Sequence, residues 1–466
     1  MMSKTSLFRG AALGALLALG FGAVAQAKPM KHHHHASHVV VVHEDGDKAE
    51  LQELRDQVRA LTDRLNAQEG ASQQAQATAQ QAQASAQAAA SQAQTAQASA
   101  DAEIRRIPAS VDQSVNVAVA KIKPPTGWWN NTQIGGTVFY DLTNIDQKSD
   151  GVKVPGAPNG VNFDIKRMYI AIDHQFNSVF SANLTTDFTY DSTVGATQLY
   201  IKKAYVQAKL NNSLIFRAGS ADLPWVPFVE GLYGYRYVEN VMIDRTKFGT
   251  SADWGVHVLG SIPMGGLTVS YAGSVVNGNG YKKPGFIGGV NHTNGMDFEG
   301  RLSASAAGFT AAVGGYDGKL GKDIQGSPTY HDATRFDALL AYVKGPIRLG
   351  GEYFHANDWN DVTQVNPLLT NKTEGWSGWG SFAFTPQLSV FGRYDWVKPK
   401  DSTNPTLAND YFNVGIQYEP VKTLDFSLVY KQDKVNNGTY ATQNGTIGGV
   451  TNGTYDEIGL FGQIKW

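Results

Sequence analysis

The 466-residue chain contains no cysteine. This absence excludes disulfide frameworks, thiolate nucleophiles and cysteine-based zinc sites. An excess of one charge is also missing, because 39 lysines and arginines stand against 41 aspartates and glutamates, so no overall field favours nucleic acid as a partner. After residue 27 no stretch reaches the ~20 consecutive apolar residues that a membrane-spanning helix needs. If the chain lies in a membrane, it can do so only as a closed β-barrel.

The first 27 residues have the three parts of a signal peptide. Lys4 and Arg9 precede a short apolar run at 11–24, and Ala25-Gln26-Ala27 forms a cleavage site of small residues. This pattern predicts export of a mature chain that begins at about Lys28.

Residues 28–47 form a histidine-rich segment that we expect to be flexible. It contains His32, His33, His34 and His35 in one run, and imidazoles at this density bind zinc, nickel or copper. A solvated tail or a purification tag explains the same run. These four histidines are therefore weak metal candidates, and no cofactor is expected.

Residues 48–107 have the periodicity of a coiled coil. Leu51, Leu54, Val58, Leu61 and Leu65 recur at alternating steps of three and four, which is a heptad seam, and alanines continue the same register to residue 100. Because alanine layers bury little area, this helix should depend on partner helices. A disordered alanine- and glutamine-rich spacer is the alternative, and residues 108–130 are expected to be a linker.

Residues 131–466 alternate apolar and polar side chains in segment after segment. The chain's 50 glycines, 21 phenylalanines, 20 tyrosines and 9 tryptophans also favour strands and turns. We count sixteen candidate strands, among them 133–142, 333–344 and 424–432, and their connections alternate between very short links and long polar ones such as 143–161 and 434–454. Barrels of the outer membrane have short periplasmic turns and long outer loops in this order, so the predicted fold is an all-β transmembrane barrel of about 16 antiparallel strands, preceded by the coiled coil.

The last predicted strand ends on an aromatic residue. Ile458, Leu460, Ile464 and Trp466 share one face of this segment, which we expect to point toward lipid. The terminal Trp466 resembles the signal that the outer-membrane barrel assembly machinery reads.

The third long connection, residues 220–252, is unusually rich in aromatic and charged residues. So many aromatic side chains in solvent would form a costly apolar patch, so we expect this loop to fold into the barrel and narrow it. An outer loop packed on its neighbours or in a trimer contact is the alternative. The candidate constriction residues are Trp225, Phe228, Glu230, Tyr233, Tyr235, Arg236, Arg245 and Lys247.

Strand parity places charged side chains of both signs toward the lumen. The predicted basic lining residues are Arg167, Lys203, Arg217, Arg301, Arg348 and Arg393. The predicted acidic ones are Asp141, Asp173, Asp187, Asp297, Glu299, Glu352 and Asp395. Mixed rings of this kind produce a transverse field rather than a strict anion filter, and charges that merely hydrate the lumen explain them equally well.

One part of the barrel resembles a known family. Ala204-Tyr205-Val206, Arg217-Ala218-Gly219 and Pro227-Phe228-Val229-Glu230 are similar to motifs of the phosphate-selective porins named for porins O and P. The resemblance is sharp over residues 198–245 and implies a trimer that passes small solutes, anions such as phosphate among them. The third loop has no surplus of arginine or lysine, which disfavours strict phosphate selectivity. Sugar porins with an N-terminal coiled coil share the architecture.

These patterns together predict an outer-membrane porin of a Gram-negative bacterium with its N-terminal segment in the periplasm. The expected partners are two further copies of the chain, outer-membrane lipid, the assembly machinery and small solutes. The first alternative is a sugar-specific porin in which Trp225 and Tyr233 form a sliding surface for pyranose rings. An envelope tether or a barrel enzyme is a further alternative, but no catalytic constellation is recognisable and we expect no enzyme activity.

Overall fold

The computed structural model describes residues 46–104, 127–191, 196–282, 292–324, 326–366 and 368–466. The chain separates into two units, Met1–Ile122 and Lys123–Trp466. The predicted signal peptide, His32 to His35 and residues 105–126 lie outside the described part.

The described part of the first unit is one helix, α1 (Gly46–Ile104), of 59 residues. The predicted seam residues Leu54, Val58, Leu61 and Leu65 are each about 60% exposed on this single helix, at 62, 59, 61 and 60%. Their apolar stripe is thus available to another helix. No helix within the described residues combines the length and hydropathy that crossing a bilayer requires.

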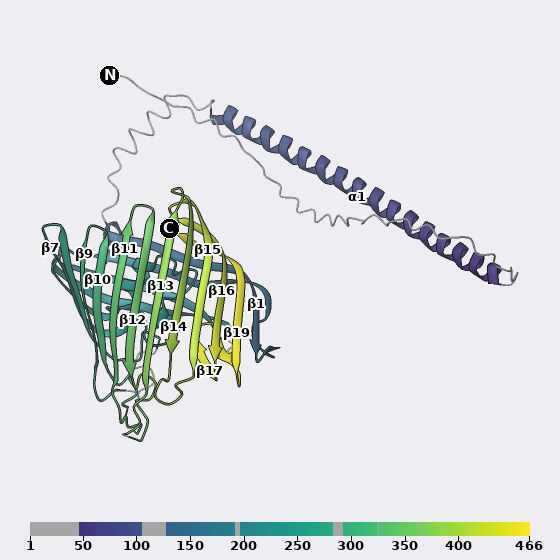
Figure 1. Ribbon diagram of the computed structural model, residues 1–466. Coiled ribbons are helices and arrows are strands. Elements are labelled where there is room, and N and C mark those ends of the chain that lie inside the picture. Colours follow the sequence, from purple (N-terminus) through teal and green to yellow (C-terminus); the bar gives the residue numbers. More distant parts are fainter. Residues whose placement is uncertain (1–45, 105–126, 192–195, 283–291, 325, 367) are drawn as a thin grey trace. The chain divides into compact units, whose positions relative to one another are not determined.

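The second unit is a closed antiparallel barrel of sixteen long strands (Figure 1). Strand β1 pairs with β3 on one side and with β19 on the other, which closes the sheet. The prediction of the fold class is therefore confirmed. The strands are β1 (Thr132–Ser149), β3 (Gly160–Gln175), β4 (Phe180–Asp191), β5 (Ala196–Asn211), β6 (Leu214–Asp222), β7 (Ala252–Met264), β8 (Leu267–Val276), β9 (Asp297–Ala306), β10 (Phe309–Gly318), β11 (Ala333–Lys344), β12 (Ile347–Asn357), β13 (Lys372–Ala383), β14 (Leu388–Lys398), β15 (Ala408–Val421), β16 (Leu424–Asn436) and β19 (Asn452–Lys465).

The outer surface of the barrel is apolar. In β16, Leu428 is 57% exposed, whereas its neighbours Ser427 and Val429 are each 1% exposed. Most of the strands likewise expose apolar side chains on their outer face. Examples are Leu142, Phe163, Leu199, Phe216, Val256, Leu302, Leu340, Leu349, Trp376, Val414 and Leu460. An outward apolar belt around a polar interior is stable when lipid, rather than water, surrounds the wall.

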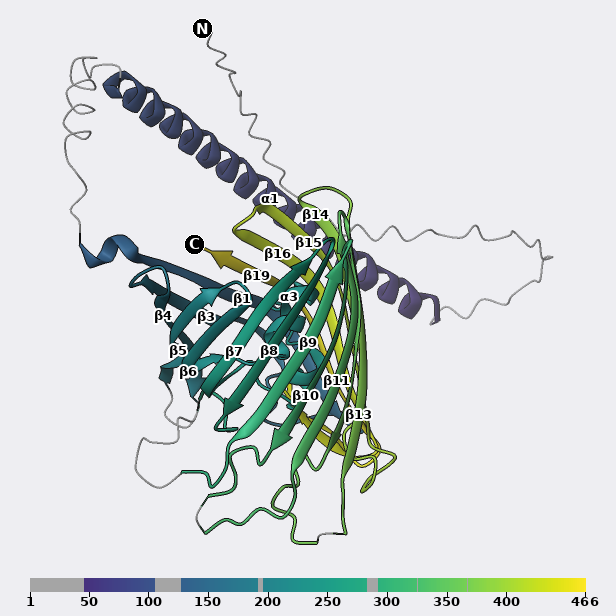
Figure 2. The same ribbon diagram turned by 90° about the vertical axis from the view of Figure 1, so that its left-hand side faces the viewer.

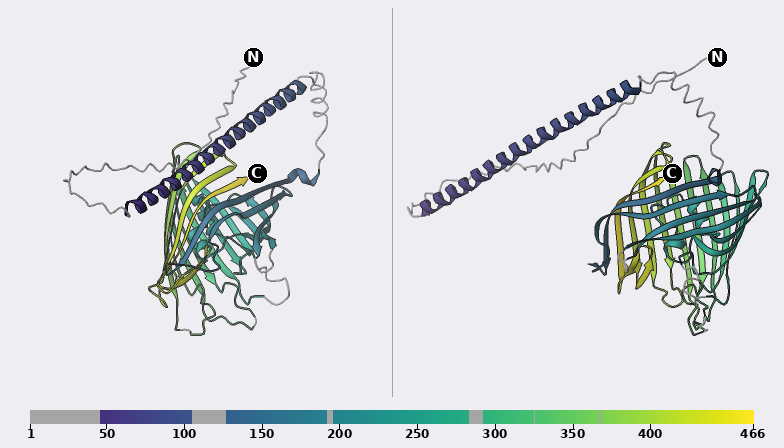
Figure 3. Two further views of the ribbon diagram at one scale, coloured as in Figure 1. Left: turned by 90° about the vertical axis from the view of Figure 1, so that its right-hand side faces the viewer. Right: turned by 180° about the vertical axis from the view of Figure 1, so that it is seen from behind.

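The seam between the first and last strands is closed by aromatic rings that lie over glycines. Trp466 exchanges backbone hydrogen bonds with Gly136, and a Cβ at Gly136 would lie 2.2 Å from the Trp466 ring. Tyr140 covers Gly462 in the same way, at 2.3 Å. Figure 3 shows the yellow strand β19 beside the dark blue β1 at this seam. The terminal aromatic residue therefore packs on the strand that it must meet for the barrel to close.

Two connections that we predicted as open loops carry regular structure. Strand β1 continues seven residues beyond the predicted end at Leu142, and the short strand β2 (Val152–Lys153) pairs back onto it. The connection between β16 and β19 contains a hairpin, β17 (Thr439–Thr442) and β18 (Gly445–Gly448). The predicted loop bounds 143–161 and 434–454 are wrong here, because ladder hydrogen bonds continue after the apolar alternation ends.

Asp150 joins these two connections. Its carboxylate accepts hydrogen bonds from the backbone N–H groups of Asn452, Thr451 and Val450, at 2.9, 2.8 and 2.7 Å. These donors lower the pKa of Asp150 to about 2. The first and last long connections are therefore held together at one end of the seam.

Candidate functional site: the narrowed lumen

Residues 223–251, which we call the inner segment, lie inside the barrel between β6 and β7. The segment contains α3 (Val226–Tyr233) and α4 (Met242–Arg245), and Figure 2 shows α3 framed by the strands. It forms hydrogen bonds with side chains of β3, β9, β11, β12, β14, β15 and β16. A short segment can reach so many strands of a closed barrel only from within.

Arg245 is the central anchor of the inner segment. Its guanidinium is fully buried and donates to Asp395 at 3.0 Å, to Asp433 at 3.0 Å and to Asn409 at 3.1 Å. The same group lies 4.2 Å from the centre of the Tyr411 ring. Paired carboxylates and an aromatic face compensate for the cost of burying this charge. The C-terminal end of α4 is thereby fixed to β14, β15 and β16.

Wall arginines bind backbone carbonyl oxygens along the rest of the segment. The four pairs are Arg301 with Pro224 at 2.8 Å, Arg335 with Phe248 at 2.5 Å, Arg348 with Leu232 at 2.5 Å and Arg393 with Asn240 at 2.6 Å. Charge-assisted bonds of this kind satisfy carbonyls that no strand or helix pairs. Arg301, Arg348 and Arg393, which parity places inward, therefore hold the inner segment in position.

Five of the predicted acidic residues are buried, and four of them bind the inner segment, wall arginines or the connection after β10. Glu299 accepts a bond from the backbone N–H of Trp225 at 3.0 Å, and Glu352 accepts one from its indole at 3.4 Å. Asp395 pairs with two arginines. Asp297 accepts the backbone N–H groups of Lys319 and Leu320, at 2.8 and 2.7 Å. These carboxylates are 0–4% exposed, so they fix the segment and the outer connections.

The aromatic residues of the inner segment are largely covered. Trp225, Tyr233 and Tyr235 are 0, 1 and 5% exposed, and Tyr235 stacks on Phe391 with ring centres 4.0 Å apart. Trp225 and Tyr233 therefore present no surface to a passing sugar ring. Only Phe228 among the predicted aromatic residues stays partly accessible, and Arg301 covers one of its faces at 3.8 Å.

The accessible side of the lumen lies along β3 to β6. Here Arg167 pairs with Asp187 at 2.8 Å, Lys203 with Asp222 at 2.6 Å, and Arg217 donates to Gln207 at 2.9 Å. Asp173 accepts a bond from Asn183 at 2.8 Å, and Asp141 is half-buried on β1. The inner segment faces this wall with its own ion pair, Arg236 to Glu230 at 2.5 Å. Polar groups of both signs thus line this side of the barrel interior.

Two lysines that parity reasoning missed also enter the lumen. Lys166 in β3 and Lys202 in β5 are extra residues at β-bulges, where the pairing register shifts. Lys166 donates to the carbonyl of Val238 at 2.7 Å, and Lys202 lies 4.5 Å from the centre of the Tyr169 ring. A bulge interrupts the alternation of faces, so strict period two predicts neither lysine on the inner side.

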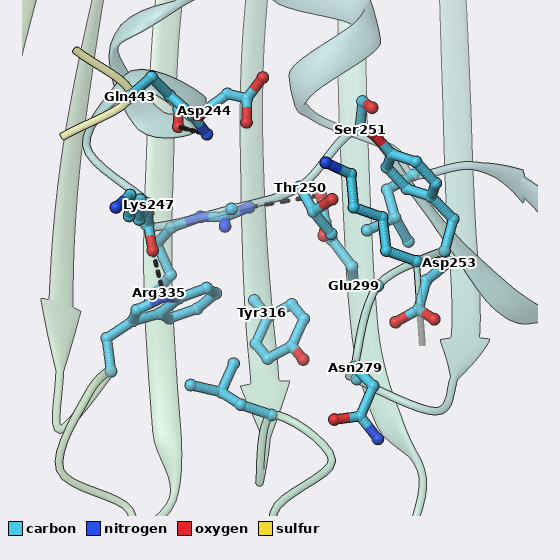
Figure 4. A pocket seen from close by; sticks show the side chains of 18 of the residues that line it. Asp244, Lys247, Thr250, Ser251, Asp253, Asn279, Glu299, Tyr316, Arg335 and Gln443 are labelled. Atoms are coloured by element: carbon cyan, nitrogen blue, oxygen red, sulfur yellow. Dashed lines mark hydrogen bonds and ion pairs between the residues drawn. The ribbon is translucent and has the colours of Figure 1, made fainter. Parts of the chain in front are cut away.

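A cavity of 340 Å³ lies between the inner segment, the wall and the outer connections (Figure 4). Its lining includes five cationic side chains, Arg167, Arg236, Lys247, Lys282 and Arg335, and three carboxylates, Asp244, Asp253 and Glu299. Burial lowers the pKa of Lys247 and of Lys282 below the ordinary lysine value. Among the described residues no group of three histidine, aspartate or glutamate side chains is placed to hold a metal ion.

No protein-family model matches the sequence, and no curated protein matches it. Solved structures are similar in fold. An anion-selective porin from Comamonas acidovorans is 11% identical, with a TM-score of 0.50 over 72% of this chain and 99% of that chain. The outer membrane channel DcaP of Acinetobacter baumannii is 15% identical, with a TM-score of 0.47 over 72% and 97%. A loop L8 deletion mutant of OmpT, an outer membrane protein of Vibrio cholerae, is 13% identical, with a TM-score of 0.47 over 72% and 99%.

At these identities the similarity defines the fold alone. The chain has the closed sixteen-stranded antiparallel barrel found in outer-membrane porins, preceded by a helix.

Proposed function

We propose that the protein is a porin of a Gram-negative outer membrane, through which small polar solutes diffuse passively. One observation carries the proposal. The inner segment is tied to β9, β11, β12, β14, β15 and β16, while ion-paired side chains that are at most partly exposed border the lumen along β3 to β6. A polar passage inside an apolar wall suits hydrated solutes.

A modest preference for anions belongs to this proposal, with phosphate as one test solute. Two acidic groups on the accessible wall have basic partners, in the pairs Arg167–Asp187 and Lys203–Asp222, and Asp173 accepts from the Asn183 amide. Lys166 and Lys202 add cations, and within the described residues neither forms an ion pair with a carboxylate. The charges of these two lysines lie next to the inner segment, where they should attract anions.

The helix α1 is proposed to be a periplasmic coiled coil that joins three copies of the chain. Its exposed leucine and valine stripe supports this assignment. Deletion of residues 48–107 should convert heat-sensitive trimers on an unheated gel to monomers and remove helical circular dichroism. Trimers of unchanged stability after the deletion would contradict the assignment.

The decisive measurement is planar-bilayer conductance of the mature chain under a potassium chloride gradient. Stepwise channels with an anion-signed reversal potential are expected, and phosphate should reduce the current more than maltose. Lys202→Gln should move the reversal potential toward zero, whereas Lys209→Gln, at an exposed lysine of the same strand, should leave it unchanged.

The other outcomes of this measurement select between the alternatives. Block by maltose with no ion preference would favour a sugar porin, in which solutes contact rings other than Trp225 and Tyr233. Failure of the purified barrel to conduct at all would refute the porin, and a tether or a lipid-hydrolysing barrel would then be tested directly.

A further inference from the structure

The hairpin β17–β18 between the last long strands lies against the inner segment. Its turn contacts the end of α4, although about 200 positions separate the two in the sequence. The hairpin carries one tyrosine and one glutamine, Tyr440 and Gln443, on the side that meets α4. We call residues 439–448 the outer hairpin.

The outer hairpin binds three consecutive carbonyl oxygens at the end of α4. Gln443 donates its side-chain amide to Asp244 at 3.3 Å and its backbone N–H to Arg245 at 2.9 Å. The Tyr440 hydroxyl donates to Thr246 at 2.6 Å. The last carbonyls of a helix have no partner within the helix. Here a distant loop supplies partners for all three, although the Asp244 carbonyl also accepts the backbone N–H of Lys247 at 3.2 Å, and Figure 4 shows Gln443 beside Asp244.

A buried carboxylate joins the hairpin and the inner segment a second time. Asp433 accepts hydrogen bonds from Thr442 and Asn444 of the hairpin, each at 3.0 Å. The same oxygen accepts from Arg245 at 3.0 Å. Because the three donors converge on one group, movement of the hairpin changes the surroundings of the Arg245 anchor.

The outer hairpin is itself held by the barrel wall. Ile447 is fully buried in a cluster with Leu407, Val435 and Tyr455, which come from the β14–β15 connection, β16 and β19. Gln147 of β1 donates to the carbonyl of Thr446 at 2.7 Å. The barrel wall therefore fixes the hairpin independently of the inner segment. An element that positions another must itself be fixed in this way.

We propose that the outer hairpin is a latch that holds the α4 end of the inner segment and so sets the width of the passage. Tyr440 and Gln443 are its positioning residues. This inference rests on the proposed porin function, because a width has a consequence only when solutes pass. Release of the latch frees the α4 carbonyls, loosens the segment between its wall contacts and gives a wider, less uniform passage.

The test compares the full-length double variant Tyr440→Phe/Gln443→Ala with the wild type. Amide hydrogen exchange over residues 242–248 should accelerate about tenfold or more, since two hydrogen bonds are lost. Single-channel conductance should rise, with a broader distribution of step sizes. Tyr330→Phe, at a half-exposed tyrosine of another outer connection, is the matched control and should change neither reading.

Each result decides the proposal. Unchanged exchange would refute the latch, and so would faster exchange with unchanged conductance, because the hairpin would then hold the segment without setting the width. If the wild type conducts and the double variant shows the same conductance and exchange, the latch alone is overturned. If the wild type never conducts, the porin function itself is overturned. If the double variant fails to fold, as its migration on an unheated gel would reveal, Tyr440→Phe alone serves the same comparison.

Discussion

Replacement of Arg245 by methionine should loosen the inner segment and destabilise the barrel. Arg245 is completely buried and donates to Asp395, Asp433 and Asn409. Methionine fills much of the same volume but offers no donor. The substitution therefore removes the charge and leaves two buried carboxylates with fewer partners.

The magnitude follows from what those carboxylates retain. Removal of one partner from a buried ion pair costs about 3–5 kcal/mol. Asp395 keeps both of its bonds to Arg393, and Asp433 keeps the amide of Asn409, so the lower end of that range, about 3 kcal/mol, applies. With a urea slope of about 3 kcal/mol per molar, the unfolding midpoint should fall by about 1 M.

The assay is urea unfolding of the detergent-solubilised barrel, followed by tryptophan fluorescence. Arg217→Met is the control, because Arg217 lies on the accessible wall and loses its bond to Gln207 and its contact with the Tyr205 ring, 4.8 Å away, together worth about 1–2 kcal/mol. Equal midpoints for Arg245→Met and the wild type would refute the anchoring role, and so would a larger loss in the control.

Three further predictions concern pH, selectivity and closure. The pKa of Asp150 is lowered to about 2 in the folded chain from an ordinary 3.8, so its contribution to stability is complete above about pH 4 and is lost as the pH falls toward 2. The unfolding midpoint of Asp150→Asn, measured over the same pH range, should not show this loss. Asp187→Asn deprives Arg167 of its ion-pair partner and should shift the reversal potential toward anions, and a shift toward cations would contradict the assignment. Gly136→Val places a Cβ 2.2 Å from the C-terminal tryptophan ring and should cost about 1–3 kcal/mol in refolding experiments, while Gly378→Ala, which meets nothing within 4 Å, should not.

The strands were largely predictable because the face on which a residue lies depends only on its position along the strand. The predicted strand at 333–344 coincides with β11, and the predicted strand at 424–432 forms most of β16. Strand ends were less predictable. β1 and β16 extend beyond their apolar portions, where backbone pairing continues without the side-chain pattern that marks the membrane.

Parity also indicated which charged side chains face inward, but not what they do there. Arg167 and Arg393 both lie on the inner side, yet Arg167 borders the accessible lumen and Arg393 is buried against the inner segment. Strand parity missed Lys202, because a single extra residue at a bulge interrupts the alternation of inward and outward side chains. Burial and pairing depend on the folded inner segment, whose path has no periodicity.

The sequence by itself determined the alternation of the strands, the order of short and long connections, and the leucine seam of α1, because these are properties of residues close together in the chain. Only the tertiary structure decided that Arg245 meets Asp433, 188 positions away, and that Gln443 caps α4. Such contacts exist only after the barrel closes, since closure of the sheet brings the last connection against the third. The position of the inner segment therefore depends on contacts that exist only in the closed barrel.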